Sequence, residues 1–334
     1  RQHTFCLIKT PMRLSLAGGG TDFPDLFSQI EYGSVLSCAI NSYVYTSVRL
    51  LNEKFHEKFR IEYSTVELAN SIQEIKNNIV RGVLTKLECN DLMQINVISD
   101  IPGGSGLGGS SVFCVSLIHA LNFLNSDDTS PKLLSNLANQ VELKLLDRKM
   151  GLQDALPPAY GGLMHYRMKS LEEIEAQKLN NQSLVKYLNQ NIRLIWTQEH
   201  RNSETILKGQ ITDISQHIDL YKELRDLTED AVQKLRNEHS AENMYSVLRN
   251  TIRSCHDIKN IIAAGVVSSG AEKIIDMLTE LGVHGYRVVG AGNGGFVLAV
   301  VNPDNALAFK EKFINYKIVA PSISMHGSLV QHIS

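Results

Sequence analysis

The alternation of hydrophobic and polar positions around residue 100 predicts a strand, a glycine-rich loop and a helix in succession. The segment from Ile95 to Ser99 alternates as a half-buried strand does, and the loop Pro102–Ser111 follows it. Apolar residues then recur at helical spacing, at Val112, Phe113, Val115, Ile118 and Leu121. The first turn of a helix leaves backbone N–H groups unpaired and carries the positive end of the helix dipole, and glycines let a ligand approach the main chain. The pattern therefore predicts an anion site suited to nucleotide phosphates.

Other interpretations of this loop follow from its sequence. A glycine-rich turn capped by a serine is the structural alternative, and the loop alone does not decide against it. A Walker A loop is excluded because Gly109, and not Lys, precedes Ser110. Three glycines of the loop match the dinucleotide-binding pattern, but a helix beginning at Pro131 follows where that fold requires a second strand. The same pattern recurs at Gly290–Gly295, so it discriminates little alone.

The remaining pattern predicts two halves that both mix strands and helices. In the first half we expect strands at Phe5–Lys9 and Leu14–Ala17 on either side of a turn at Pro11. Further strands are expected within Val35–Leu50, with a break near Asn41, and within Tyr160–Tyr166. A second helix is expected after the glycine loop. In the second half we expect a strand at Ile192–Trp196, helices within Leu220–Leu235, Ala271–Leu281 and Asn305–Phe313, a hairpin of Tyr286–Val289 with Phe296–Val301, and a last strand after Lys317. Helices over an antiparallel sheet make the second half α+β. A chain of 334 residues is long enough for about two domains, which we place at residues 1–185 and 186–334.

Composition argues against several classes of function. Basic and acidic residues are nearly balanced, 33 against 35, and are interspersed, so nucleic acid and membrane surfaces are not expected partners. No apolar run is long enough for a membrane span, and the first residues lack the apolar core of a signal peptide. Since no Met begins the chain, we expect the numbering to start after a lost residue or tag. The five scattered cysteines lack C-x-x-C spacing, which favours reduced thiols in a cytoplasmic protein, and the eleven histidines form no zinc-binding cluster.

Three segments in order resemble one superfamily of small-molecule kinases. They are Thr10–Asp22, the glycine loop Pro102–Ser111 and Val289–Val297, and their order and spacing span nearly the whole chain. Together they resemble the GHMP kinases, the superfamily of galactokinase, homoserine kinase, mevalonate kinase and phosphomevalonate kinase. The resemblance implies an α+β fold of two domains, the N-terminal one like domain 2 of ribosomal protein S5 and the C-terminal one ferredoxin-like. It also implies that ATP and the second substrate lie in the cleft between them.

Further blocks resemble the subfamily of D-glycero-D-manno-heptose 7-phosphate kinases. These blocks are Ala17–Pro24, Gly33–Tyr45, Asp100–Gly108, Gly151–Asp154 and Ala159–Gly162. The resemblance implies an ATP- and Mg²⁺-dependent kinase that phosphorylates the anomeric hydroxyl of a heptose phosphate in nucleotide-heptose biosynthesis. Two alternatives stay open: a kinase for another sugar such as fucose or galactose, and a sensor of the same fold that binds sugar or nucleotide without catalysis. The sequence also leaves open whether the chain is a monomer or a homodimer.

The resemblance implies roles for individual residues. Asp154 matches the catalytic aspartate that accepts the proton of the attacking hydroxyl, and Arg13 matches a position near the transferred phosphate. Glu142 matches a magnesium-binding glutamate, and the second ligand is a hydroxyl from Ser110 or Ser111 or a water molecule in its place. The phosphates of ATP are expected at Pro102, Gly103, Gly104, Ser105, Gly106, Leu107, Gly108, Gly109, Ser110 and Ser111. The sugar is expected at Arg13, Gly18, Gly19, Gly20, Thr21, Asp22, Asp154 and Gly292, with Arg201 and Ser203 as weaker candidates for its phosphate.

These residues also have purely structural interpretations, and the sequence departs from the family at two positions. Asp154 alone could cap a loop, Arg13 could lie on the surface between strands, and Asp22 could belong to a turn. Gly109 stands where many relatives carry Ser, and Ala155 where they carry Gln. These departures motivate the sensor hypothesis. Retention of the catalytic aspartate and of the metal-binding glutamate argues against it, because a sensor needs neither a base nor a metal ligand.

Overall fold

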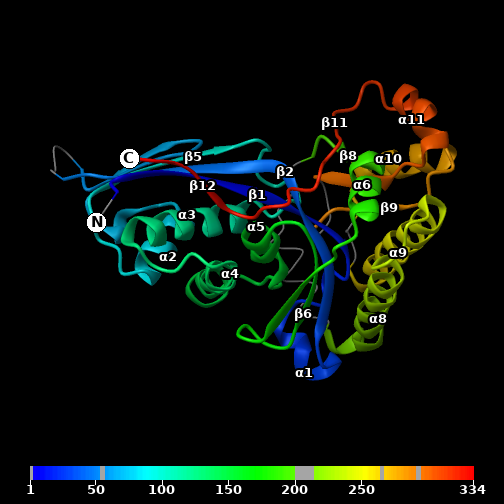
Figure 1. The fold of residues 1–334 in the computed structure, drawn as a ribbon, viewed down its shortest axis with the longest axis horizontal. Coiled ribbons are helices and arrows are strands. Elements are labelled where there is room, and N and C mark those ends of the chain that lie inside the picture. Colours follow the sequence, from blue (N-terminus) through cyan, green and yellow to red (C-terminus); the bar gives the residue numbers. More distant parts are fainter. Residues whose placement is uncertain (1–2, 53–56, 200–213, 264–266, 291–294) are drawn as a thin grey trace.

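The fold consists of two β-sheets that follow one another along the long axis of the molecule, each covered by helices (Figure 1). The computed structural model describes residues 3–52, 57–199, 214–263, 267–290 and 295–334. The first sheet has eight strands in the order β12-β1-β2-β5-β3-β4, with β6 pairing with β2 and β7 with β6. These strands are β1 (Phe5–Ala17), β2 (Gly33–Leu50), β3 (Phe59–Glu62), β4 (Val66–Ala69), β5 (Met93–Ser99), β6 (Leu163–Met168), β7 (Ile174–Lys178) and β12 (Leu329–Ile333).

Two long neighbouring strands, β1 and β2, run through the first sheet. They pair antiparallel over most of their length, while the first part of β2 also pairs with β6 and its last part with β5. The expected turn at Pro11 is wrong, because β1 runs unbroken through this residue. Pro11 lies beyond the stretch Cys6–Lys9 that β12 covers, so its missing N–H costs no hydrogen bond to that strand. The expected break near Asn41 is a bulge instead, since the register jumps from Tyr43 to Ile40 directly after Pro11.

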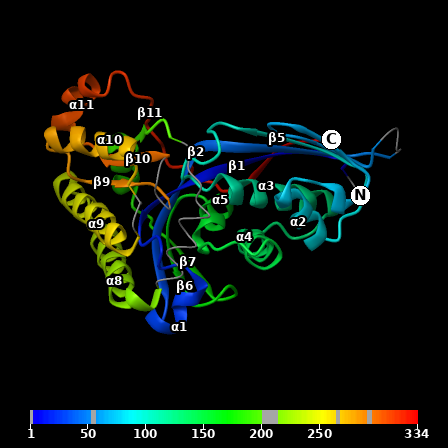
Figure 2. The same ribbon diagram turned by 180° about the vertical axis from the view of Figure 1, so that it is seen from behind.

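Helices cover one face of the first sheet, as the view from behind also shows (Figure 2). They are α2 (Asn78–Lys86), α3 (Gly109–Asn125), α4 (Pro131–Asn139) and α5 (Leu156–Tyr160), with the short α1 (Phe27–Ile30) near the start of β2. The expected succession of strand, loop and helix is confirmed, because β5 ends at Ser99 and α3 begins at Gly109 against β1 and β2. α4 continues into a π-helical turn, Gln140–Leu145, a feature that is frequent at functional sites.

The second half folds around a four-stranded antiparallel sheet in the order β11-β8-β10-β9. Its elements are α6 (Gln182–Asn191), β8 (Ile192–Trp196), α8 (Ile218–Leu235), α9 (Ala241–Ile262), α10 (Ser269–Glu280), β9 (Tyr286–Val288), β10 (Phe296–Val300), α11 (Ala306–Lys312) and β11 (Ile318–Val319). The strand, the hairpin and the three helices expected in this half are confirmed within a few residues at their ends. Among the described residues, no helix is both long and apolar enough to cross a lipid bilayer.

The last strand returns to the first sheet. β12 pairs with β1, and the backbone N–H of Thr4 donates to the carbonyl of Ser334, so the two ends of the chain lie close together (Figure 1). One continuous hydrophobic cluster also contains Leu14 and Leu16 of β1 together with Leu224 of α8 and Leu248 of α9. The division into residues 1–185 and 186–334 therefore stays a proposal, with β12 as a strand that crosses it.

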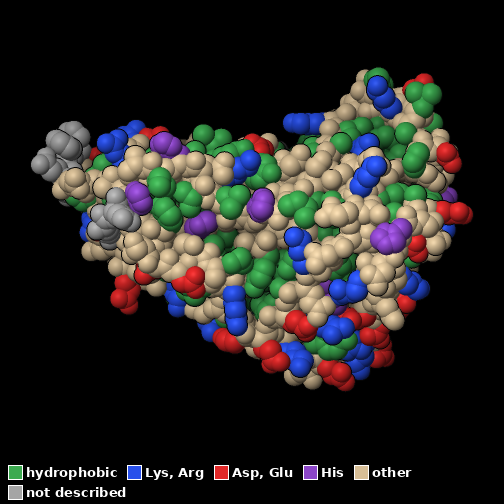
Figure 3. All heavy atoms as spheres, in the orientation of Figure 1, with side chains coloured by type: hydrophobic (Ala, Val, Ile, Leu, Met, Phe, Trp, Pro, Cys, Tyr) green, Lys and Arg blue, Asp and Glu red, His purple; other side chains and the backbone are tan. Residues whose placement is uncertain are grey.

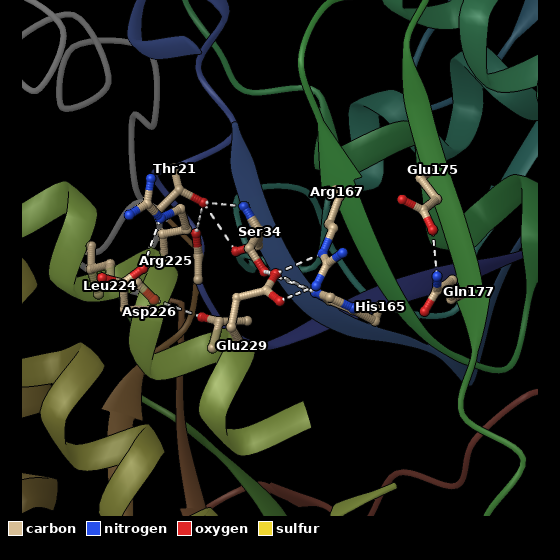
Figure 4. Close-up of polar contacts among 12 residues, drawn as sticks. Thr21, Ser34, His165, Arg167, Glu175, Gln177, Leu224, Arg225, Asp226 and Glu229 are labelled. Atoms are coloured by element: carbon tan, nitrogen blue, oxygen red, sulfur yellow. Dashed lines mark hydrogen bonds and ion pairs between the residues drawn. The ribbon is translucent and has the colours of Figure 1, made fainter. Parts of the chain in front are cut away.

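Glu229 on α8 joins the two halves through a polar cluster (Figure 4). Its carboxylate accepts hydrogen bonds from Ser34 Oγ on β2 at 2.8 Å and from Arg167 on β6, and lies 3.1 Å from His165 Nε2. Ser34 also binds Thr21, whose hydroxyl accepts from Ser34 N at 3.0 Å and donates to the carbonyl of Ser34. The cluster thus fixes the loop after β1 against α8. Acidic and basic side chains are intermixed on the surface around α1 and α8 (Figure 3).

The Glu229 cluster predicts a pH-dependent contribution to stability. Burial opposes ionisation of Glu229, but hydrogen bonds from His165, Arg167 and Ser34 outweigh it and hold its pKa well below the usual range. Because the folded pKa lies below the unfolded value of about 4.3, the stabilisation is complete above that pH and is lost as the pH falls below it. We expect Glu229→Gln to lower the free energy of unfolding by about 1–3 kcal/mol at pH 7, the range for hydrogen bonds to a charged group.

Thermal unfolding between pH 7 and pH 3 checks this. The difference between wild type and Glu229→Gln should shrink as the pH falls. Asp230→Asn is the matched control, since Asp230 is 54% exposed on the same helix and pairs only with exposed Lys234 among the described residues. A difference that stays constant over the pH range would show that the Glu229 charge does not stabilise the fold.

Candidate active site

A cleft of about 770 Å³ opens where the two halves of the chain meet. Its lining comes from the glycine loop, from β1 and the loop after it, from the π-helical turn and the residues up to Asp154, and from single side chains of α9 and β9. A ligand in this cleft would therefore contact both halves of the chain.

The glycine loop forms one wall of the cleft and ends at the N-terminus of α3. Gly108 precedes the helix in the left-handed conformation, with φ of 75°, and no side chain caps the helix. The serine-capped turn is therefore wrong, and the first N–H groups of α3 are left for a ligand. Pro102 is exposed outside the cleft and Leu107 is buried in the core. The other predicted phosphate-binding residues line the cleft: Gly103, Gly104, Ser105, Gly106, Gly108, Gly109, Ser110 and Ser111.

Arg13 and Asp154 form an ion pair that borders the glycine loop. Arg13 Nε lies 2.7 Å from Asp154 Oδ1, and Arg13 Nη1 donates to the carbonyl of Gly106 at 3.0 Å. The Arg13 side chain is 4% exposed and that of Asp154 24%, so Arg13 is not a surface residue. It joins β1, the glycine loop and the 3-10 turn Gln153–Ala155 that carries Asp154. Asp154 thus lies beside the loop with access from the cleft, as a base for a bound hydroxyl must.

Asp22 holds the segment that carries Asp154. Its buried carboxylate accepts hydrogen bonds from Gly20 N at 2.9 Å, from Gln153 N at 3.0 Å and from Gln153 Nε2 at 3.3 Å. A side chain on Gly151 would collide with this carboxylate, because a Cβ there would lie 1.9 Å from Asp22 Oδ2. Burial raises the pKa of Asp22, and these N–H donors oppose the rise. Asp22 borders the cleft, but its carboxylate oxygens already accept hydrogen bonds from Gly20 and Gln153.

The other residues predicted to bind sugar divide into two groups. Gly19 and Gly20 line the cleft, whereas Gly18 and Thr21 lie behind it. Gly18 packs against β2, since a Cβ there would lie 1.9 Å from the carbonyl oxygen of Ser34. Gly292, Arg201 and Ser203 lie outside the described residues.

Glu142 and Arg148 form a second ion pair, next to the start of α3. Glu142 is 1% exposed, and its Oε2 lies 2.8 Å from Arg148 Nη1. The same Nη1 donates to the Ser110 hydroxyl, so the two predicted metal ligands already converge on one cationic group. Burial raises the pKa of Glu142, opposed by the Arg148 guanidinium and by the side chain of Ser111.

Several cleft residues were missed by the sequence analysis: Ser15, Arg148, Gln153, Lys259 and Arg287. Only Lys259 left a clear signal in the sequence. It continues the buried stripe of α9 through Leu248, Ile252 and Cys255, where an apolar residue is expected. Burial and the neighbouring Arg287 guanidinium lower its pKa to about 7.

Four buried polar atoms of the lining have no hydrogen-bond partner among the described residues. They are Ser15 Oγ, Glu142 Oε1, Gln153 Oε1 and Arg287 Nε. Unpaired buried polar atoms are rare in folded proteins, and each calls for an explanation. A polar ligand bound in the cleft would supply hydrogen-bond partners for these four atoms.

Two family models match the chain, one in each half. The model described as "GHMP kinases N terminal domain" matches residues 78–162, and "GHMP kinases C terminal" matches residues 220–318. Together they cover more than half of the chain. The chain belongs to the GHMP kinase family. The mixed two-domain fold expected from the resemblance is confirmed, and the enzyme is an ATP-dependent phosphotransferase with an alcohol group as acceptor.

Individual GHMP kinases are similar over nearly the whole chain. The D-glycero-alpha-D-manno-heptose 7-phosphate kinase of Campylobacter jejuni is 25% identical, covering 88% of this chain and 89% of that one. The galactokinase of Pyrococcus furiosus is 24% identical, covering 90% of each. Among solved structures, a D-glycero-D-manno-heptose 1-phosphate kinase from Bacteriodes thetaiotaomicron superposes with a TM-score of 0.78 at 20% identity, covering 98% of this chain and 99% of that one.

The open space at the N-terminus of α3 predicts where ATP binding can be blocked without harm to the fold. A Cβ at Gly109 would meet no atom of the described residues within 4 Å, and this glycine does not need a positive φ. We expect Gly109→Val to raise the Kd for ATP tenfold or more, about 1.4 kcal/mol, because its methyl groups would enter the space for phosphate oxygens. Isothermal titration with ATP measures the change. Thermal stability should be unchanged or slightly higher, since Val forms helix better than Gly. An unchanged ATP affinity in the folded variant would remove this loop from the nucleotide site.

Proposed function

We propose that this GHMP kinase transfers the γ-phosphoryl group of ATP to the anomeric hydroxyl of D-glycero-D-manno-heptose 7-phosphate. The Arg13–Asp154 pair carries the proposal, because it presents a carboxylate directly beside the glycine loop. The names of the Campylobacter and Bacteriodes kinases support a heptose phosphate as the acceptor. We also propose that the reaction takes place in the cytoplasm, where ATP is available and the five free, buried cysteines would stay reduced.

In the proposed reaction the acceptor hydroxyl lies between Asp154 and the terminal phosphate of ATP. Asp154 takes the proton of the acceptor hydroxyl while the hydroxyl oxygen bonds to the γ-phosphorus of ATP. ADP leaves with the electron pair of the broken P–O bond. Arg13 orients Asp154 through its Nε and brings positive charge next to the transferred group. The N–H groups at the start of α3 hold the phosphates in line with the acceptor.

Magnesium fits the residues at the start of α3, and we include it in the proposal. Its preferred ligands are oxygens, and Glu142 offers a buried Oε1 without a hydrogen-bond partner next to the hydroxyls of Ser110 and Ser111. When bound, the ion would neutralise charge on the phosphates of ATP. The Arg148 guanidinium, which joins Glu142 to Ser110, would have to give up these contacts.

A kinase for a free sugar is the second candidate, and the similarity to a galactokinase over most of the chain favours it. The sensor alternative is set aside, because the chain belongs to a kinase family and Asp154, Glu142 and the glycine loop line the same cleft.

A panel of acceptors tests the proposed function. We expect kcat/KM for D-glycero-D-manno-heptose 7-phosphate to exceed that for galactose, fucose and mannose, measured by ADP release in a coupled assay with Mg²⁺ and ATP. Phosphorus NMR of the product should show a second phosphate on the anomeric carbon. A higher kcat/KM for a free sugar would contradict the heptose phosphate assignment and favour the second candidate.

The role of Asp154 predicts a selective loss of the chemical step. Asp154→Asn keeps the shape of the side chain but cannot accept the proton, so kcat should fall by about 10²–10⁴-fold while the Kd for ATP changes little. Asp147→Asn is the matched control, because Asp147 is 88% exposed in the same segment and should leave kcat unchanged. If Asp154→Asn keeps a near-normal kcat, Asp154 only supports the loop, and the proposed mechanism is wrong.

A further inference from the structure

Two cations lie in the cleft without a role in the mechanism above. Lys259 from α9 and Arg287 from β9 both line the cleft. Arg287 is 1% exposed, donates to the carbonyl of Ser15, and keeps an unpaired Nε. Lys259 Nζ donates to the carbonyl of Gly290 at 3.2 Å. These are contacts to neutral groups, and none of the described residues forms an ion pair with either cation.

Lys259 and Arg287 differ in this respect from the two other arginines that line the cleft. Arg13 is paired with Asp154, and Arg148 with Glu142, so these charges are balanced within the protein. Taking an unpaired charge out of water costs several kcal/mol. Burial lowers the pKa of both groups, to about 7 for Lys259 and about 10 for Arg287, and the neighbouring Arg287 guanidinium adds to the lowering for Lys259. An anionic ligand would supply the missing counter-charge.

Polar atoms from three segments converge on the space above Gly19. A Cβ at this glycine would lie 3.0 Å from Gln153 Nε2, 3.4 Å from Ser15 Oγ and 3.6 Å from Lys259 Nζ. The Ser15 hydroxyl is buried and has no hydrogen-bond partner in the part of the chain that the structure describes. The absence of a side chain at Gly19 therefore leaves room for a ligand group between a hydroxyl, an amide and an ammonium.

A series of contacts leads from the glycine loop to the neighbourhood of Lys259. Arg13 reaches the glycine loop through Gly106 and also binds Asp154. From Asp154 the chain turns back to Gln153, which binds Asp22 on the loop that also carries Gly19. These contacts run from the glycine loop through the Arg13–Asp154 pair to the loop that carries Gly19, beside Lys259.

We propose that Lys259 and Arg287, with the Ser15 hydroxyl, bind a phosphate group that the acceptor already carries. The inference rests on the proposed function and deepens it: the acceptor class is a sugar phosphomonoester, and its existing phosphate is distinct from the group that ATP donates. A phosphate dianion matches two cations and a hydroxyl donor, whereas a neutral sugar would bring no negative charge to either cation.

This assignment also predicts a pH dependence. The groups that act on Lys259 are Arg287 and Arg13, which lower its pKa, and Asp22 and Cys255, which raise it. Since the ammonium is lost as the pH rises through about 7, preference for the phosphorylated acceptor should decline above that pH. Lys259→Arg keeps the charge and should flatten this decline.

The test compares each sugar with its own phosphomonoester: heptose with heptose 7-phosphate, mannose with mannose 6-phosphate, and galactose with galactose 6-phosphate. kcat/KM is measured for wild type, Lys259→Met and Lys259→Arg. We expect wild type to prefer a phosphorylated member, and Lys259→Met to reduce that preference by roughly 10–100-fold, the loss of one hydrogen bond between charged groups. Turnover of the free sugar should change little, and Lys259→Arg should restore part of the preference.

Three results would overturn the inference: a preference for the free sugars, an equal loss for both members of a pair in Lys259→Met, or a raised KM for ATP with the acceptor preference unchanged. The last would assign the cations to the nucleotide. If no sugar is turned over at all, the proposed function is wrong, but phosphate binding by Lys259 and Arg287 can still be tested. Titration calorimetry with mannose 6-phosphate then measures that binding directly. Binding to wild type that Lys259→Met weakens would support it, and the absence of binding would contradict it.

Discussion

The ion pair between Arg13 and Asp154 is the interaction on which the rest of the cleft depends. It links a strand of the first sheet to the turn that carries the carboxylate, and its second hydrogen bond fixes the carbonyl of Gly106 in the glycine loop. A guanidinium that is 4% exposed cannot move without losing both partners. Its fixed position sets how far the carboxylate lies from the glycine loop, and this distance determines whether a hydroxyl can be held between the two.

The surrounding residues keep the carboxylate in place. Asp22 anchors Gln153, the neighbour of Asp154, and only a glycine at position 151 leaves room for that anchor. The loop that carries Asp22 is held in turn by Thr21 and Ser34, which connect it to Glu229 on α8. The two halves of the chain thus meet through polar contacts directly behind the cleft. A phosphotransferase needs such preorganisation, because its catalysis consists mostly of positioning and charge stabilisation.

The sequence predicted the features that depend on local pattern. The glycine loop, the helix after it and the strand at Ile192–Trp196 follow from periodicity, and they lie where the structure has them. The resemblance to a kinase family brought Arg13, Asp154 and Glu142 into one site although 141 residues separate the first two. The turn expected at Pro11 is wrong, because a proline breaks a strand only where the ladder needs its N–H, and no local pattern reveals which neighbours a strand will have.

The residues that local reasoning could not find are those brought in by tertiary packing. Arg287 comes from a strand of the second half and has no motif around it, and the charge of Lys259 in the apolar stripe of α9 does not reveal which residues it faces. Asp22 was expected to bind the sugar, and no feature of the sequence showed that Gly20 and Gln153 would occupy its oxygens. Pairing partners of buried charges depend on the complete fold, so charge balance in a cleft is learned from the structure.

A double-mutant cycle on Arg13 and Asp154 shows whether Arg13 positions the catalytic carboxylate. It compares single-turnover rates of wild type, Arg13→Gln, Asp154→Asn and the double variant at saturating ATP and acceptor. If Arg13 acts by orienting Asp154, its substitution should slow wild type strongly but slow Asp154→Asn only a few-fold, because the group it orients is already inactive. Losses that multiply in the double variant would show that the two residues act independently, and would contradict the claim that this pair positions the catalytic carboxylate.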